Sequence, residues 1–200
     1  MSLLRRPEVT VLASFGLSIG LLLYLIPSRS VQSDSTPPVQ VAATPLKKVA
    51  PPLIAMPVRL KIPRIKVDAA LSYVGLTPQG ALAVPIDPTD AGWYDRGTIP
   101  GQAGIAVIDG HLNQKGGRPA VFDKLHKLRS GDSLYVEDQN GATTAFVVRN
   151  IRVYRRDETV PVVFTSTDGG AHLNLITCEG IWDEARHSYS GRLVVFADKQ

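Results

Sequence analysis

From residue 57 to the C-terminus, short runs rich in Val, Ile, Leu and Tyr alternate with turns rich in Gly, Pro, Asn and Asp. Strand-sized runs at this spacing are typical of an all-β barrel or sandwich. Asp-Gln-Asn-Gly at 138–141 separates two such runs, and Asn-Gly is a strong signal for a hairpin turn. We therefore expect one all-β domain over residues 57–200, with enough strands to close a barrel. The predicted strands are residues 58–62, 69–74, 81–84, 104–108, 133–137, 143–154, 172–177 and 192–197.

One segment of this domain has a helical pattern. Val121, Leu125 and Leu128 are three or four residues apart, a spacing that places them on one face of a helix. Pro119 precedes the segment and Gly131 follows it, as is typical of helix boundaries. We expect a helix over residues 120–127, so the predicted fold is all-β with one or two short helices.

Residues 9–26 form an uncharged apolar run of eighteen residues that follows Arg5 and Arg6. A helix of this length rises about 27 Å, close to the roughly 30 Å hydrocarbon thickness of a bilayer. Because basic residues favour the cytoplasmic side, we predict a single transmembrane anchor, with residues 1–8 in the cytoplasm and the folded domain outside the cell. A cleaved signal peptide is the alternative, although the apolar run is long for one and no small-residue cleavage site follows it.

Residues 27–56 are rich in Ser, Thr, Pro, Gln and Ala. This composition buries little surface and favours extended backbone, so we predict a semi-rigid spacer between the anchor and the domain. The net charge is +4, but Lys and Arg are scattered rather than clustered. This distribution argues against a nucleic-acid partner and suits a location beside an anionic membrane or wall polymer.

Cys178 is the only cysteine of the chain and lies in the sequence HLNLITCEG, at the end of a predicted strand. A lone cysteine is most often a small buried apolar side chain. Outside the cytoplasm, however, an unpaired thiol is exposed to oxidation and needs a specific explanation. Strand ends meet loops, where reacting groups are commonly presented. Cys178 is therefore a candidate nucleophile.

A cysteine nucleophile acts as the thiolate and is commonly activated by a histidine or another cation. His111 directly follows the apolar run GIAVIDG, so it also lies at a predicted strand end. His187 is the second candidate, since it shares a loop with Cys178. His126 is expected to face solvent, and His172 begins the cysteine strand, about 20 Å away from the thiol at the rise of an extended chain.

Arg192 opens the last predicted strand, in SGRLVVFA. A single arginine at a strand end is more often a surface charge than a functional group. Acyl transfer from a thiolate, however, places negative charge on a carbonyl oxygen, and a fixed guanidinium can stabilise that charge. Arg192 is therefore a candidate oxyanion donor.

The motifs GHL at 110–112 and LITC at 175–178 and the strand at Arg192, in this order behind an apolar N-terminal segment, resemble a sortase. The phrases AVIDGH, AVFDKL, SGDSLYV and LNLITCEG fit the same family, and the resemblance covers about residues 57–200. Within the family the chain is most similar to the class F enzymes of actinobacteria. The resemblance implies an eight-stranded sortase-type β-barrel and a cysteine transpeptidase, with residues 57–200 as the catalytic domain.

The resemblance also implies residue roles. Cys178 matches the nucleophile of the family, His111 its acid/base partner, and Arg192 the arginine that positions substrate and supports the oxyanion. Thr177 matches the threonine before the cysteine and is expected to contact substrate. The family pattern is Thr-Leu-x-Thr-Cys, and Asn174 stands where the first threonine would be. This departure concerns a supporting position rather than the reacting atoms.

Sortases of Gram-positive bacteria cut a sorting signal such as Leu-Pro-x-Thr-Gly between Thr and Gly. By resemblance, the acyl group would pass through a thioester on Cys178 to an amine of the cell wall or a pilin lysine. The expected partners are surface proteins that carry the signal and the amine acceptor. The loop of residues 160–171 is expected to shape the choice of substrate.

Two other functions fit the same residues. A cysteine hydrolase would use the Cys-His pair and release an acid, and a membrane-tethered wall-binding domain would carry Cys178 merely as a buried side chain. One cysteine and dispersed histidines form no zinc pattern. Asp87, Asp90, Asp95 and Asp109 lack the dense spacing of a calcium loop. We therefore expect neither a metal nor a cofactor.

Overall fold

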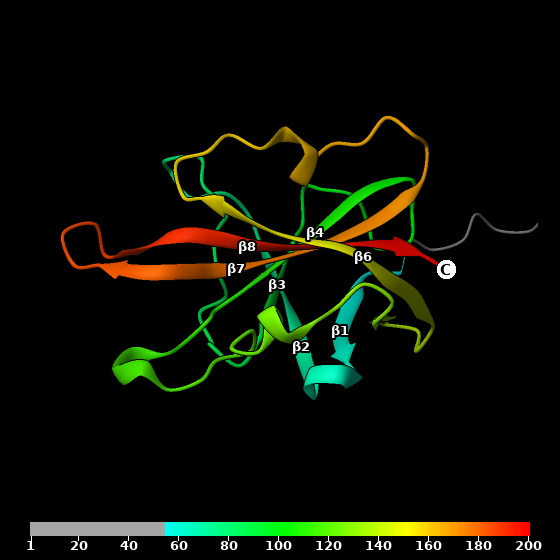
Figure 1. The fold of residues 1–200 in the computed structure, drawn as a ribbon. Helices are drawn as coiled ribbons and strands as arrows, with labels where there is room; N and C mark the ends of the chain where they lie inside the picture. The colour runs from blue at the N-terminus through cyan, green and yellow to red at the C-terminus, as the bar shows by residue number, and fades with distance from the viewer. Residues whose placement is uncertain (1–54) are drawn as a thin grey trace, which may run out of the picture. The chain divides into compact units, whose positions relative to one another are not determined.

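A computed structural model describes residues 55–200, in which the chain forms a closed β-barrel (Figure 1). The strand order is β1-β2-β3-β4-β7-β8-β6-β5, and pairing of β5 with β1 closes the barrel. The expectation of an all-β, eight-stranded barrel is confirmed. The strands are β1 (Pro57–Ile62), β2 (Val67–Val74), β3 (Ala91–Tyr94), β4 (Gly104–Gly110), β5 (Ser133–Asp138), β6 (Thr143–Arg155), β7 (Ala171–Asp183) and β8 (Ser188–Lys199).

Seven of the eight predicted strands lie within observed strands, and the eighth prediction, at residues 81–84, is wrong. The run at residues 81–84 is no strand, because its backbone bonds locally, from the Thr77 amide to Ala81 and from the Ala83 amide to Gly75. Its place in the barrel is taken by β3, which pairs in parallel with β2 and antiparallel with β4. The predicted hairpin is confirmed, since β5 pairs antiparallel with β6 and Gly141 in the turn has a φ of +80°.

The helix predicted over residues 120–127 is wrong. The Val121 and Phe122 amides donate to the carbonyls of Pro88 and His111 at 3.0 Å each, which ties the start of the segment to neighbouring loops. The following amides bond three residues back, as in the Leu125 to Phe122 bond of 3.1 Å, which is the 3-10 pattern. Within residues 55–200 the helices are four 3-10 turns, η1 (Pro63–Ile65), η2 (Lys115–Gly117), η3 (Leu125–Lys127) and η4 (Pro161–Val163).

Strands β4, β7 and β8 are buried on both faces. Their inward side chains join the core inside the barrel, whereas the alternate side chains pack on the outside against the loop between β6 and β7. This loop, residues 156–170, contains η4 and covers the outer face of the sheet (Figure 1). Burial on both faces explains why these strands are apolar without a clean alternation. The outer cluster consists of Ile105, Val107, Val163, Ile176, Val194 and Phe196.

Strands β7 and β8 continue past the barrel as a two-stranded ribbon, which projects at the left of Figure 1. Cys178 pairs with Arg192, the register then shifts, and Asp183 pairs with Ser188 before the turn. Both strands are longer than predicted, because residues 180–182 are exposed and carry no buried-strand pattern. Cys178 therefore lies within β7, at the point where the strand leaves the barrel core, rather than at the end of the strand.

The predicted cytoplasmic segment (residues 1–8), the anchor (9–26) and nearly all of the spacer (27–56) lie outside the described residues. Among residues 55–200, no helix combines the length and the apolar character needed to cross a membrane.

Gly110, the last residue of β4, leaves no room for a side chain. A Cβ at this position would lie 2.5 Å from the ring of Phe122 and 2.8 Å from Val121, and both side chains are buried. Gly110→Ala is expected to lower the free energy of unfolding by about 1–3 kcal/mol, the range typical of overpacking. Chemical denaturation measures this effect. Gly75→Ala is the matched control, since a Cβ at Gly75 meets nothing within 4 Å, and an equal loss in both variants would contradict the packing argument.

Candidate active site

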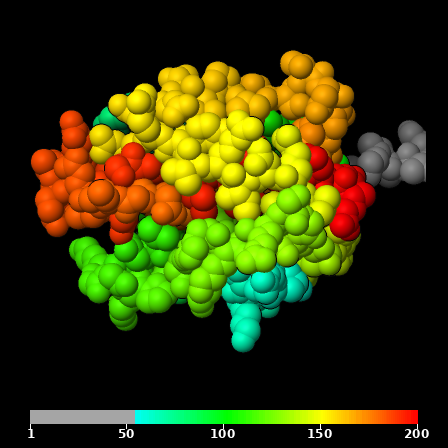
Figure 2. Space-filling model, viewed as in Figure 1, coloured from blue at the N-terminus to red at the C-terminus, as the bar shows by residue number. Residues whose placement is uncertain are grey.

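The three residues predicted to react line one cavity. Cys178 comes from β7, Arg192 from β8, and His111 directly follows β4. The cavity has a volume of about 460 Å³, and the β6–β7 loop forms one wall of it. In Figure 2 the end of β6 and this loop, in yellow to gold, form the upper part of the surface. Apolar side chains dominate the lining, namely Leu82, Val84, Val160, Val163, Phe164, Ile176 and Val194.

Cys178 and Arg192 are opposite each other in the antiparallel β7–β8 pair. Directly opposite residues point to the same face with Cβ atoms about 4.5–5.5 Å apart. The pairing thus places Cys178 and Arg192 on the same face of the ribbon through backbone hydrogen bonds rather than through loop contacts. Cys178 is a free, partly buried thiol.

The surroundings of Cys178 hold its thiol protonated. Burial raises the pKa of the thiol, the Asp109 carboxylate raises it further, and the Arg192 guanidinium opposes both, with a net shift upward. At neutral pH the resting thiol therefore keeps its proton. The reactive thiolate has to form by proton transfer to a base within the site.

His111 has a fixed ring orientation. Its Nε2 lies 2.9 Å from the carbonyl oxygen of Pro85, which accepts a hydrogen bond. Because a carbonyl only accepts, Nε2 carries a hydrogen, and in the neutral imidazole the lone pair is at Nδ1. Nδ1 is therefore the nitrogen able to exchange a proton within the site.

Arg192 is tethered by its own strand. Its Nη1 donates to the Gly191 carbonyl at 2.8 Å and to the Tyr189 carbonyl at 3.4 Å, and its Nη2 donates to the Ser188 hydroxyl at 3.2 Å. A guanidinium has five N–H groups, so donors remain for a ligand.

Thr177 is buried, with 1% of its surface exposed, and its hydroxyl donates to the Gly110 carbonyl at 2.7 Å. Since Thr177 precedes Cys178 and Gly110 precedes His111, this bond joins the backbone segments that carry the thiol and the imidazole. The substrate contact expected of Thr177 stays a prediction.

A second cavity of about 700 Å³ meets the first at Val84 and at the same three residues, His111, Cys178 and Arg192. Its walls are the loop after β4, residues 112–117, and the β7–β8 ribbon. A hydrogen bond from the Asn113 amide to the Tyr189 hydroxyl connects these two walls. The thiol is thus reached from two sides.

The other histidines have different surroundings. His126 is exposed, as expected, and His172 is buried between two carboxylates. His187 lies in the turn of the ribbon, where its ring is 6.5 Å from that of Trp182, and it lines only the second cavity. Of the four histidines, His111 is the one that lines both cavities.

The Sortase domain family model matches residues 60–200 of the chain. The chain belongs to the sortase family. This confirms the family assigned from the GHL and LITC motifs, whereas the similarity to class F stays a prediction because the neighbouring structures are sortases C. No curated protein matches the chain in sequence.

Solved sortase C structures share the fold. Sortase C1 of the GBS pilus island 1 is 23% identical, with a TM-score of 0.53, over 72% of this chain and 64% of that chain. Sortase C-1 from Actinomyces oris is 23% identical, with a TM-score of 0.54, over 72% of this chain and 73% of that chain. Sortase C1 from Streptococcus agalactiae is 22% identical, with a TM-score of 0.56, over 72% and 66%. The chain therefore spans less than two thirds of the first of these proteins.

Asp109 is a residue of this sortase site that the sequence did not point to as part of the chemistry. It lines the first cavity and lies on the outer face of β4, where Ile105 and Val107 precede it at alternate positions. Burial raises the pKa of Asp109 to about 7, although the Gly110 amide and the Arg192 charge act in the opposite direction. The signal in the sequence was a carboxylate at the end of an otherwise apolar strand, two residues before His111.

Asp109→Asn is expected to make Cys178 more reactive at alkaline pH. Above pH 7 the Asp109 carboxylate is charged and raises the thiol pKa, so its removal lowers that pKa and increases the thiolate fraction. Below pH 6 the carboxyl is mostly neutral and the two proteins converge. The rate of iodoacetamide alkylation against pH measures the effect. Glu158→Gln, an exposed carboxylate on the same cavity, is the control, and equal alkylation rates in Asp109→Asn and the wild type at pH 8 would refute the assignment.

No group of three or more potential metal-ligating side chains gathers anywhere in the described part of the chain. Asp87 instead caps its own turn by accepting from Thr89, and Asp90 accepts from Ser72. The absence of a metal remains a prediction of the sequence.

Proposed function

We propose that this chain is a membrane-anchored cysteine transpeptidase that cuts an LPxTG-like sorting signal between Thr and Gly. The acyl fragment would pass through a Cys178 thioester to an amine of the cell wall or of a pilin. The observation that carries this proposal is that the register of β7 and β8 pairs Cys178 with Arg192 at the junction of two cavities that both include His111.

In the first step the apolar cavity takes the donor peptide. The Cys178 thiol transfers its proton to His111, and the thiolate attacks the threonine carbonyl carbon. Remaining N–H groups of Arg192 stabilise the oxyanion. The C–N bond breaks, and imidazolium His111 returns the proton to the departing glycine amine. The tethering of Arg192 to Gly191 and Ser188 supports this role, because a fixed donor needs no rearrangement during the reaction.

In the second step an amine attacks the thioester from the side opposite the acyl chain. The second cavity provides such an approach, since it reaches Cys178 and His111 independently of the apolar cavity. Neutral His111 takes the proton of the attacking amine, the C–S bond breaks, and the thiol is restored. Two entrances to one sulfur favour transfer to a second substrate over hydrolysis as the main reaction.

The membrane location belongs to this proposal as well. Residues 9–26 would span the bilayer once and hold the catalytic domain outside the cytoplasm, with residues 27–56 as the spacer. A donor protein held in the same membrane would then meet the enzyme at a raised effective concentration.

Product analysis with and without an added amine tests the proposed reaction. A sorting-signal peptide is incubated with the protein, and mass spectrometry follows the fragment that ends in Thr. A transpeptidase yields the amide adduct when amine is present, whereas a cysteine hydrolase yields the free acid in both cases. A wall-binding domain leaves the peptide intact.

A further inference from the structure

The β6–β7 loop forms one wall of the donor cavity in the proposed reaction. Val160, Val163 and Phe164 of this loop line the cavity, and Val163 also belongs to the apolar cluster on the outer face of the sheet. The position of the loop therefore sets the width of the space in which the apolar part of a donor peptide would lie.

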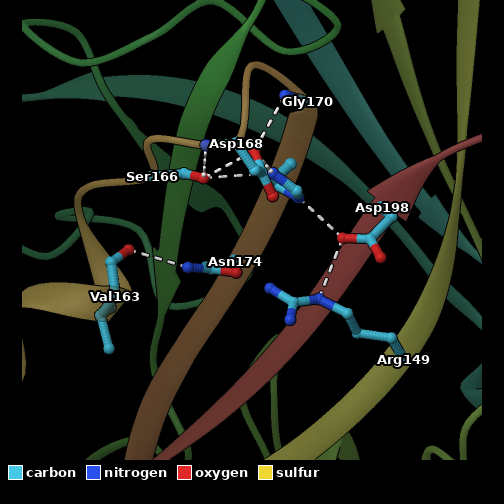
Figure 3. Close-up of polar contacts among 8 residues, drawn as sticks. Arg149, Val163, Ser166, Asp168, Gly170, Asn174 and Asp198 are labelled. Atoms are coloured by element: carbon cyan, nitrogen blue, oxygen red, sulfur yellow. Dashed lines mark hydrogen bonds and ion pairs between the residues drawn. The ribbon is translucent and has the colours of Figure 1, made fainter.

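Backbone hydrogen bonds hold the two ends of this loop, from the Arg156 amide to Ser190 and from the Gly104 amide to Gly170. Between these ends, among the described residues, the hydrogen bonds that join residues 159–169 to the strands all come from the side chains of Asn174 and His172 of β7 (Figure 3). Asn174 Nδ2 donates to the Val163 carbonyl at 2.8 Å, and His172 Nε2 lies 2.9 Å from Asp168 Oδ1. Two residues apart in a strand, Asn174 and His172 point to the same face. They reach the loop at η4 and near its C-terminal end.

Asn174 is fully buried, and its Oδ1 is the one buried side-chain polar atom without a partner among the residues described. A buried amide with an unsatisfied oxygen is unfavourable for stability. An apolar side chain would avoid that penalty, so stability alone does not explain asparagine at this position. The contact with Val163 gives the amide a specific task, which is to hold η4 against the sheet.

His172 is 7% exposed and lies between two carboxylates, with Nε2 at 2.9 Å from Asp168 and Nδ1 at 2.7 Å from Asp198. Ionised carboxylates only accept hydrogen bonds, so both ring nitrogens carry hydrogen and the ring is an imidazolium. A neutral ring has one N–H and keeps only one of the two contacts. Both carboxylates have other donors, Arg149 for Asp198 and the Ser166 hydroxyl and Gly170 amide for Asp168. Of the two contacts of the ring, the one with Asp168 is the one that reaches the loop.

The protonation of His172 sets the pH range of this contact. Burial lowers the pKa of His172, but the hydrogen bonds and charges of Asp168 and Asp198 outweigh it, so the pKa lies above its ordinary value. The imidazolium, the Gly170 amide and the Ser166 hydroxyl lower the pKa of Asp168. The contact is therefore complete from about pH 4, the ordinary value of Asp, to about pH 6.5, the ordinary value of His. It weakens as pH rises through the pKa of folded His172.

We propose that Asn174 and His172 are positioning residues of the donor cavity, which fasten the β6–β7 loop at two points, and that the second point releases when His172 loses its proton. That the cavity binds a donor peptide rests on the proposed function. That the two side chains hold the loop does not. It assigns a role to Asn174, at which the chain departs from the Thr-Leu-x-Thr-Cys pattern.

Hydrogen exchange of the loop amides in the full-length chain in detergent micelles tests the fastening. At pH 6, Asn174→Leu and His172→Gln are each expected to exchange the amides of residues 163–168 about tenfold faster than the wild type, as for a lost hydrogen bond. The amides of β4, β7 and β8 stay protected. His126→Gln, an exposed histidine outside both cavities, leaves the loop unchanged. Unchanged loop exchange in Asn174→Leu and His172→Gln overturns the proposal.

The pH dependence separates the two fastening points. Variant and wild type are compared at the same pH, so that the intrinsic pH dependence of amide exchange cancels. The ratio of the His172→Gln exchange rate to the wild-type rate is expected to fall to one between pH 6 and pH 9. The ratio for Asn174→Leu stays above one over the same range. A His172→Gln ratio that is constant with pH contradicts the release of the loop.

Peptide kinetics at pH 6 test the link to the cavity. Both variants are expected to raise KM for an LPxTG peptide about tenfold while kcat changes less than about twofold, because ground-state and transition-state binding weaken alike. Faster loop exchange with an unchanged KM refutes the positioning role. A wild-type protein that cleaves no sorting-signal peptide refutes the proposed function, and the exchange data still decide whether the two side chains fasten the loop.

Discussion

Replacing Cys178 with alanine is expected to reduce peptide cleavage and transfer to the background rate. The thiol is the only sulfur nucleophile of the chain, and it lies where the two cavities meet. Loss of a nucleophile that acts together with a base and an oxyanion donor commonly costs roughly 10⁴-fold or more in kcat. The measurement is the initial rate of sorting-signal cleavage by Cys178→Ala and by the wild type at equal folded concentration.

The same variant is expected to keep its fold. Cys178 is only partly buried, and alanine removes one atom from the wall of an open cavity rather than from the packed core. The melting temperature should stay within a few degrees of the wild type, as is usual for a change outside the tightly packed interior. Cleavage by folded Cys178→Ala at more than a few per cent of the wild-type rate would show that a different group attacks the peptide.

Arg192→Lys is expected to lower kcat by about 10²–10³-fold, the range for loss of one preorganised oxyanion donor. Lysine keeps the charge but loses the planar fork, so it cannot bond Gly191 and Ser188 and still present a fixed donor to the oxyanion. The effect should fall on kcat more than on KM, since charge develops on the carbonyl oxygen only as the reaction proceeds.

Arg186→Lys provides the control for Arg192→Lys. Arg186 lies in the exposed turn of the same ribbon, pairs with Asp183 and lines neither cavity. Its replacement should leave kcat unchanged. Equal kcat in Arg192→Lys and wild type would mean that charge alone suffices at this position and that the tethered geometry is irrelevant.

The sequence predicts a strand where local pattern and pairing agree. The hairpin at Asn140-Gly141 is encoded locally, so the β5–β6 pair is predictable. Strand β3 could not be predicted, because Ala91–Tyr94 is only four residues long and is stabilised by pairing with β2 and β4. The false helix at residues 120–127 has the opposite cause. Its apolar spacing is genuine, but its amides bond three residues back, as in a 3-10 turn, rather than four residues back as in an α-helix.

The residues of the candidate site also divide into those that local sequence features reveal and those that depend on strand pairing. Cys178 and His111 could be recognised because each follows an apolar run and precedes a glycine or polar residues in the sequence, which are local features. The pairing of Cys178 with Arg192 depends on the register of β7 and β8 and could not be derived from spacing. Asp109 escaped notice because the face on which it lies is set by the pairing of β4 with β7, which places it toward the cavity. Long-range register is thus the information that local patterns lack.

The most direct measurement of the central claim is the covalent state of Cys178 during turnover. The wild-type chain is incubated with a library of sorting-signal peptides in the absence of amine, and intact-mass analysis is followed by mapping of the modified fragment. The account predicts a mass gain equal to the peptide up to its threonine, located on Cys178 and released by hydroxylamine as expected for a thioester. Peptide cleavage without any adduct on Cys178, or an adduct on another residue, would contradict it.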